Sequence, residues 1–228
     1  MRLYMKQKII ISILLLSVSV CSAQKKRDRD IIYKPNKVFV FHAKYDSAGT
    51  VTENYIVMRI LQKEDIDNQL AITYDYYDEK PERETMDSLS SYRLAGFLES
   101  TTVLDWGNSV WVHPPRSRYH QLAQYFPFPE ISFPVKIGKR YKRGFLSPND
   151  PLCHCTLWLK FHMLINLSTQ HLYQNRLIEV YRIDGYADSK HGFFAVRYLF
   201  NEELGFVKWV YRRDNISLEL NLIDQFLR

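Results

Sequence analysis

The sequence predicts a mostly β protein, a single antiparallel open barrel or sandwich of about eleven strands with one short helix. Segments rich in Val, Ile, Tyr, Phe and Trp recur at short intervals along most of the 228 residues. Turn-forming residues separate them, as in 46–49, 201–205 and 213–215. Residues 216–222 alternate strictly between apolar and polar, which indicates a strand with one buried face.

The expected elements follow one another with short connections and no repeat or linker. The strands are expected, in chain order, over Val38–Lys44, Tyr55–Gln62, Leu70–Tyr77, Arg93–Leu104, Ser109–His113, Ser132–Ile137, Cys153–Ile165, Leu177–Tyr186, Phe193–Phe200, Phe206–Arg212 and Ile216–Ile223. The helix is expected over Ser117–Tyr125, where apolar residues recur at spacings of three and four before Pro127.

The first 23 residues have the three parts of a secretory signal peptide. Basic residues come first, Ile9–Val20 is almost entirely apolar, and small residues end at Ala23. We expect cleavage after Ala23, with lipid anchoring at Cys21 as the alternative, because Val20 replaces the small residue that a lipoprotein peptidase prefers. The expected location is the periplasm or cell surface of a Gram-negative bacterium.

Cleavage would leave a polar, mobile leader over 24–30 and a single β-rich domain over 31–228. No later segment is long and uncharged enough to cross a membrane as a helix. The formal charge falls from +6 to +3, since 28 basic and 25 acidic residues remain, so nucleic acid is not an expected partner. The basic run Lys136–Arg143 is interpreted as a solvated turn, although such a run also suits phosphate or anionic lipid headgroups.

The proline-rich stretch 113–134 contains the main candidate site. Prolines at 114, 115, 127, 129 and 134 exclude a central strand, so the stretch is expected to cross an edge or mouth of the sheet as a lid or strap. Aromatic rings and a few polar groups there suit an amphipathic ligand, and the alternative is a rigid crossing that only packs. The candidate ligand-binding residues are Trp111, His113, Arg116, Tyr119, His120, Phe126, Phe128 and, from a later strand, Trp209.

Cys153 and Cys155 are the two cysteines beyond the signal. In a strand they share one face with Leu157 and Leu159, while Trp158 points the other way. They are interpreted as apolar core thiols, with a redox-active disulfide as the alternative that an oxidising compartment favours. Their spacing does not support a metal site.

No sequence motif for catalysis is present. The chain lacks the nucleophile elbow, the zinc-binding helix motif, the phosphate loop and the dinucleotide glycine pattern. We therefore expect neither an enzyme nor a cofactor, although a catalytic site assembled from distant residues stays open.

The signal, the paired strands, the crossing with His113-Pro114-Pro115 and the ending with Leu204-Gly205-Phe206 together resemble uncharacterised exported β-rich proteins of the Bacteroidota. More distantly the pattern is similar to the open half-barrels of periplasmic lipoprotein carriers. That resemblance implies a curved sheet and a lid around an apolar groove, and it transfers no catalytic residue.

The function expected from these observations is non-catalytic binding of a lipid, another amphipathic molecule or an envelope protein. A thiol-active envelope protein using Cys153 and Cys155, or a purely structural protein, is the alternative. The sequence indicates neither the ligand nor the oligomeric state.

Overall fold

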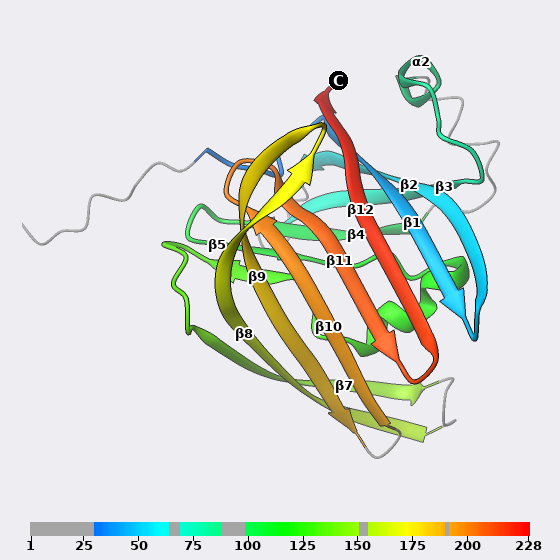
Figure 1. Ribbon diagram of the computed structural model, residues 1–228, viewed down its shortest axis with the longest axis vertical. Coiled ribbons are helices and arrows are strands. Elements are labelled where there is room, and N and C mark those ends of the chain that lie inside the picture. The colour runs from blue at the N-terminus through cyan, green and yellow to red at the C-terminus, as the bar shows by residue number, and fades with distance from the viewer. Residues whose placement is uncertain (1–29, 64–68, 88–98, 151–154, 190–191) are drawn as a thin grey trace, which may run out of the picture.

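The computed structural model describes residues 30–63, 69–87, 99–150, 155–189 and 192–228. In these residues twelve strands form one antiparallel sheet, which confirms the mostly β open fold (Figure 1). The expected signal peptide and most of the leader lie outside the described residues. None of the described helices has the length and apolar character needed to cross a bilayer.

The strands are β1 (Lys37–Ser47), β2 (Thr50–Lys63), β3 (Leu70–Tyr77), β4 (Glu99–Asp105), β5 (Ser109–Val112), β6 (Glu130–Ser132), β7 (Arg140–Asp150), β8 (Cys155–Tyr173), β9 (Arg176–Ser189), β10 (Gly192–Asn201), β11 (Gly205–Arg213) and β12 (Ile216–Leu227). The helical elements are the short α-helix α2 (Arg83–Asp87) and the 3-10 helix η1 (Arg118–Tyr125).

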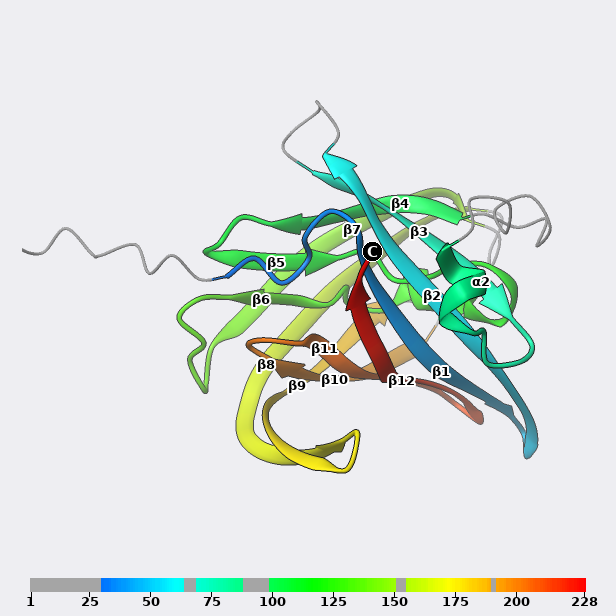
Figure 2. The ribbon, with the colours of Figure 1, turned by 90° about the horizontal axis from the view of Figure 1, so that it is seen from above.

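The sheet is a meander in which strands adjacent in sequence are adjacent in space. The order is β6-β5-β4-β3-β2-β1-β12-β11-β10-β9-β8-β7, so the pairing of β1 with β12 joins the first and last strands. The two edges are β6 and β7, which follow one another in the chain. Because strands twist, the sheet curls round on itself (Figure 2) and brings these edges toward one another. We call the place where β6 and β7 face each other the seam.

Most expected strands overlap observed ones closely, but three expectations are corrected. The strand expected over Ser132–Ile137 ends at Ser132, where the chain turns toward β7. The basic run 136–143 is not only a turn, since from Arg140 onward it belongs to β7. The short helix α2 was not expected, and the expected helix over 117–125 is a 3-10 helix.

The main core lies on the concave side of the sheet. On β8, Leu157 and Leu159 are fully buried while Trp158 between them is 53% exposed, which confirms the alternation expected there. On β12, Leu218, Leu220 and Leu222 are buried as their alternation predicts. Burial of these apolar side chains is the main force that holds the curved sheet together.

A smaller cluster lies on the outer side of the sheet, where α2 covers β1 and β2. Met86 of α2 packs there with Val38, Val40 and Val57. Beside this cluster Arg59 and Asp75 form a buried ion pair, with 3% and 4% of their side chains exposed. Arg59 also donates to the Met86 carbonyl at 3.4 Å, which ties α2 to β2.

Candidate functional site

The crossing between β5 and β6 fills the interior of the curved sheet. η1 lies behind β11 and β12 in Figure 1. Ala123, Tyr125 and Phe126 are buried, and the Phe126 ring contacts those of Phe194 and Tyr211 at centroid distances of 5.4 and 5.0 Å. The crossing therefore packs into the core as a plug.

A buried carboxylate holds the start of this crossing. Glu99 of β4 accepts hydrogen bonds from the backbone amides of Arg116 and Ser117 at 2.8 and 3.0 Å. It also accepts a hydrogen bond from the Tyr76 hydroxyl at 2.7 Å and forms an ion pair with the Arg116 side chain. Charge-assisted hydrogen bonds of this kind fix the backbone more strongly than neutral ones.

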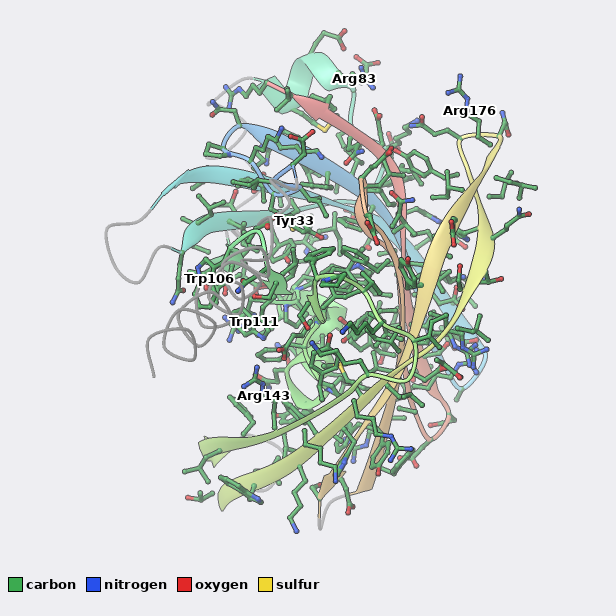
Figure 3. The ribbon with its side chains drawn as sticks, turned by 90° about the vertical axis from the view of Figure 1, so that its left-hand side faces the viewer. Tyr33, Arg83, Trp106, Trp111, Arg143 and Arg176 are labelled. Atoms are coloured by element: carbon green, nitrogen blue, oxygen red, sulfur yellow. The ribbon has the colours of Figure 1, made fainter. Side chains whose placement is uncertain are left out.

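A pocket of about 320 Å³ opens at the seam. We call it the seam pocket. Its walls come from both edges of the sheet and from the crossing, and they are Trp111, His113, Phe128, Glu130, Tyr141, Arg143, Gly144, Phe145, Phe161 and Met163. In Figure 3, Trp111 and Arg143 lie on the same side of the molecule, one above the other, with β7 and β8 below.

Aromatic rings form most of the pocket wall, and Phe128 is at their centre. Its ring lies 4.7 Å from His113, 5.5 Å from Trp111, 6.1 Å from Phe145 and 6.2 Å from Phe161, measured between centroids. Prolines on both sides of Phe128 fix its backbone and so keep this ring in place. The arrangement gives a preformed apolar surface of the kind that small-molecule sites use.

An ion pair stands at the polar side of the seam pocket. Arg143 of β7 donates to Glu130 of β6 at 2.7 and 3.2 Å, and this contact raises the pKa of the guanidinium further. The Glu130 side chain is 11% exposed, whereas that of Arg143 is 64% exposed. Arg143 is therefore the wall group that a charged ligand end can reach from solvent.

His113 contributes an uncharged ring to the same wall. Burial, helped by the nearby Arg116 cation, lowers the pKa of His113 to about 4. At neutral pH its imidazole is thus neutral, and Nδ1 lies 3.1 Å from the Pro114 carbonyl, where an N–H donates. His113 therefore adds no charge to the wall of the seam pocket.

Three of the eight predicted ligand-binding residues, Trp111, His113 and Phe128, meet in the seam pocket. Arg116 binds Glu99, and His120 is buried beside the Tyr76 ring, so neither lines the pocket. Phe126 lies in the core, as does Trp209, whose Nε1 donates to the Phe206 carbonyl. The side chain of Tyr119 lies outside the described ones.

The thiol prediction stays a prediction. Cys153 lies outside the described residues, and Cys155 opens β8 opposite Asp150 with its side chain undescribed.

The prediction missed the β6, β7 and β8 side of the seam pocket, which is made of Glu130, Tyr141, Arg143, Gly144, Phe145, Phe161 and Met163. The available signal was weak. Tyr141 and Phe145 lie four residues apart, and the register places them opposite Met163 and Leu159 on the same face. The intervening Lys142 and Arg143 hid that pattern.

A second cavity of about 380 Å³ lies beside α2 on the outer side of the sheet. Charged side chains line most of it, including Lys80, Glu82 and Glu84, and Arg83 there pairs with Asp224 at 2.8 Å. It lacks the aromatic wall of the seam pocket, so we take the seam pocket as the candidate site.

No protein-family model and no curated protein matches the sequence. Among solved structures, a candidate exported protein with a YmcC-like fold from Bacteroides fragilis aligns at a TM-score of 0.42 and 10% identity, over 86% of this chain and 98% of its own. A candidate lipoprotein from Parabacteroides distasonis aligns at 0.49 and 8% identity, over 86% and 97%. A LolA superfamily protein from Nitrosomonas europaea aligns at 0.33 and 12% identity, over 90% and 91%.

These structures are similar to this chain in fold alone. At such identities and TM-scores they assign no function and no site residue to this chain.

Proposed function

We propose that this chain is an exported, non-catalytic binding protein that holds the apolar part of a small amphipathic molecule in the seam pocket. The observation that carries the proposal is the aromatic wall around Phe128, at the seam where the edge strands β6 and β7 face each other. Export is proposed from the basic, apolar and small-residue parts of residues 1–23.

The size of the seam pocket limits the ligand. About 320 Å³ is near the lower end of the roughly 300–1,000 Å³ found for ligand sites. A single alkyl chain or one small ring system fits this volume, whereas several long acyl chains do not. The polar end of such a molecule would lie at Arg143, whose exposed guanidinium can bind a carboxylate or phosphate.

Titration with dodecanoate and dodecanol, followed by tryptophan fluorescence and by thermal unfolding, tests the proposal. We expect both to bind and to raise the melting temperature. Phe128→Ala should weaken both about tenfold, because the central ring of the pocket wall is removed. Arg143→Gln should weaken dodecanoate alone, since dodecanol has no charge for the guanidinium to bind.

Phe133→Ala is the matched control. Phe133 is also a half-buried phenylalanine near the proline-rich crossing, but its ring packs on Phe200 and does not line the pocket. It should lose stability without losing affinity. Absence of binding by either compound, or equal weakening by Phe128→Ala and Phe133→Ala, would contradict the proposed function and leave a structural or interaction role.

A further inference from the structure

Four large apolar side chains are exposed together on the outer side of β7–β10. They are Leu146, Trp158, Tyr186 and Phe193, with 50%, 53%, 37% and 56% of their surface exposed. We call them the outer patch. The Tyr186 ring stacks between those of His162 and Phe193, at centroid distances of 4.8 and 5.1 Å.

The strand register places these residues on one face. Leu146 is directly opposite Trp158, and Tyr186 is directly opposite His162. Residues opposite one another in an antiparallel pair point to the same side of the sheet. The neighbours Leu159 and Phe194 point to the other side and are fully buried, so the outer patch is separate from the core. Large apolar side chains that gather exposed on one face of a protein often mark a contact surface.

Basic side chains share this face. Arg140 and Lys142 of β7 and Lys160 of β8 are exposed, and Lys142 is directly opposite His162. With the described residues, none of these three cations forms an ion pair.

Acidic groups on the same face are fewer. Asp188 lies opposite Lys160. Asp184 is already bound by Arg182 and Arg197 at 2.7 and 2.8 Å. The outer patch is thus apolar in its middle and positively charged toward β7.

We propose that the outer patch docks this protein on the surface of an anionic lipid bilayer. Trp, Tyr and Phe rings partition to the headgroup level of membranes, because one part of that layer is apolar and the other is wet. Lysines and arginines beside them are attracted by anionic lipids. A protein partner of matching chemistry would need an acidic, apolar surface, whereas a bilayer offers both properties over any area.

The outer patch also adjoins the seam pocket. The Trp158 ring lies so close to Gly144 that a Cβ built on this glycine would be 2.7 Å from Trp158 Cζ2. Gly144 itself lines the seam pocket. Docking through the outer patch would therefore bring the pocket close to the membrane, although the docking proposal does not depend on a ligand in that pocket.

Co-flotation with lipid vesicles tests the proposal. The chain beginning at Gln24 is suitable, because it contains every strand and helix of the described residues and lacks the apolar residues 9–20. We expect binding to vesicles of phosphatidylglycerol and phosphatidylcholine, and much weaker binding to phosphatidylcholine alone or at high salt. Trp158→Ser with Phe193→Ser should weaken this binding about tenfold or more. Lys142→Gln and Lys160→Gln should each weaken it roughly fivefold.

Trp106→Ser with Leu172→Ser is the matched control. These residues are 53% and 62% exposed but belong to the β4–β5 turn and to the far end of β8. The control should bind vesicles as the unchanged chain does, and circular dichroism should show all variants folded. Equal loss in control and outer-patch variants would overturn the proposal. A second outcome would also overturn it. If the unchanged chain does not bind vesicles but forms a dimer, and Trp158→Ser dissociates that dimer, the outer patch binds a second copy of the chain.

Discussion

Arg59 and Asp75 carry opposite charges in a place that water hardly reaches. They belong to neighbouring strands β2 and β3 and lie beside the small outer cluster that α2 covers. A buried ion pair gains little net stability over apolar residues, but removal of one member leaves the other charge without compensation. Each of the two residues can therefore be replaced by an apolar one without a large loss of stability only if the other is replaced as well.

We predict that Arg59→Leu lowers the free energy of unfolding by about 3–5 kcal/mol, because Asp75 stays buried without its cation. The double variant Arg59→Leu, Asp75→Leu should be clearly more stable than Arg59→Leu alone, since no uncompensated charge remains. Urea unfolding followed by tryptophan fluorescence measures both. A double variant that loses as much as the two single variants combined would contradict the coupling.

At this scale the sequence identified the right segment for only part of the candidate site. Trp111, His113 and Phe128 lie in or beside the proline-rich stretch and line the seam pocket, while their role in binding a ligand stays a prediction. Phe126 differs from Phe128 by two positions, yet it is buried in the core while Phe128 lines the pocket. Composition alone does not separate two such rings, because the irregular backbone that follows η1 decides which way each ring points.

The edge strands β6 and β7 show how side chains can join two elements that backbone hydrogen bonds do not. The Ser132 amide of β6 donates to the Tyr141 hydroxyl of β7 at 3.0 Å, and the Ser132 hydroxyl shares a hydrogen bond with the same oxygen at 2.9 Å. Lys139 contacts the Ser132 hydroxyl as well, and Glu130 pairs with Arg143. These contacts protect two otherwise open strand edges.

We predict that Tyr141→Phe loosens the seam. The Ser132 amide loses its acceptor, so its hydrogen exchange should become about five to ten times faster, as expected when one hydrogen bond is lost. Amide exchange by NMR measures this residue by residue. As a control, Tyr55→Phe on β2, far from the seam, should leave exchange at Ser132 unchanged. Unaltered exchange in Tyr141→Phe would show that the seam is held by other contacts.

The strand β7 marks where prediction from sequence failed, and the reason is its place at an edge. An edge strand needs only one partner, so basic residues such as Lys142 can occupy its outer face without penalty. That composition is also typical of a solvated turn. The central strands β10 and β11 have neighbours on both sides and rich apolar content, and they were predicted nearly to their ends.

For the whole molecule, the meander explains why the architecture was easier to predict than the site. Every described strand pairs with a neighbour in sequence, and only the pairing of β1 with β12 joins described strands that are distant in sequence, so short turns and alternation are enough to indicate the sheet. The seam pocket instead depends on how far the sheet curls before its edges meet. Curvature is set by twist and by register shifts such as that between Val40 and Phe41, which leave little trace in the sequence.

Folding also buries two histidines of the crossing in the body of the protein, which makes stability depend on pH. Burial is the main cause that lowers the pKa of His113 and of His120 to about 4. The Arg116 cation lowers the pKa of His113 further and the Arg118 cation that of His120, while the Glu99 carboxylate acts in the opposite direction on both. The unfolded chain protonates a histidine near pH 6.5. Between about pH 6.5 and 4 the unfolded state therefore binds more protons, and stability falls as the pH falls.

We predict that this loss reaches about 2 kcal/mol for His120 alone between pH 7.5 and 5. His120→Asn keeps a side-chain donor for the Ser117 carbonyl, which Nδ1 contacts at 3.1 Å, but it cannot be protonated. The variant should be less stable than the parent at pH 7.5, because the ring contact with Tyr76 is lost, and the difference should shrink by about this amount at pH 5. Urea unfolding at both pH values measures this difference in the free energy of unfolding.

A difference that stays constant would mean that His120 is protonated in the folded protein as readily as in the unfolded one. Comparing the two chains at each pH is necessary because carboxylates such as Glu99 also lose their partners in acid, and their contribution is common to both.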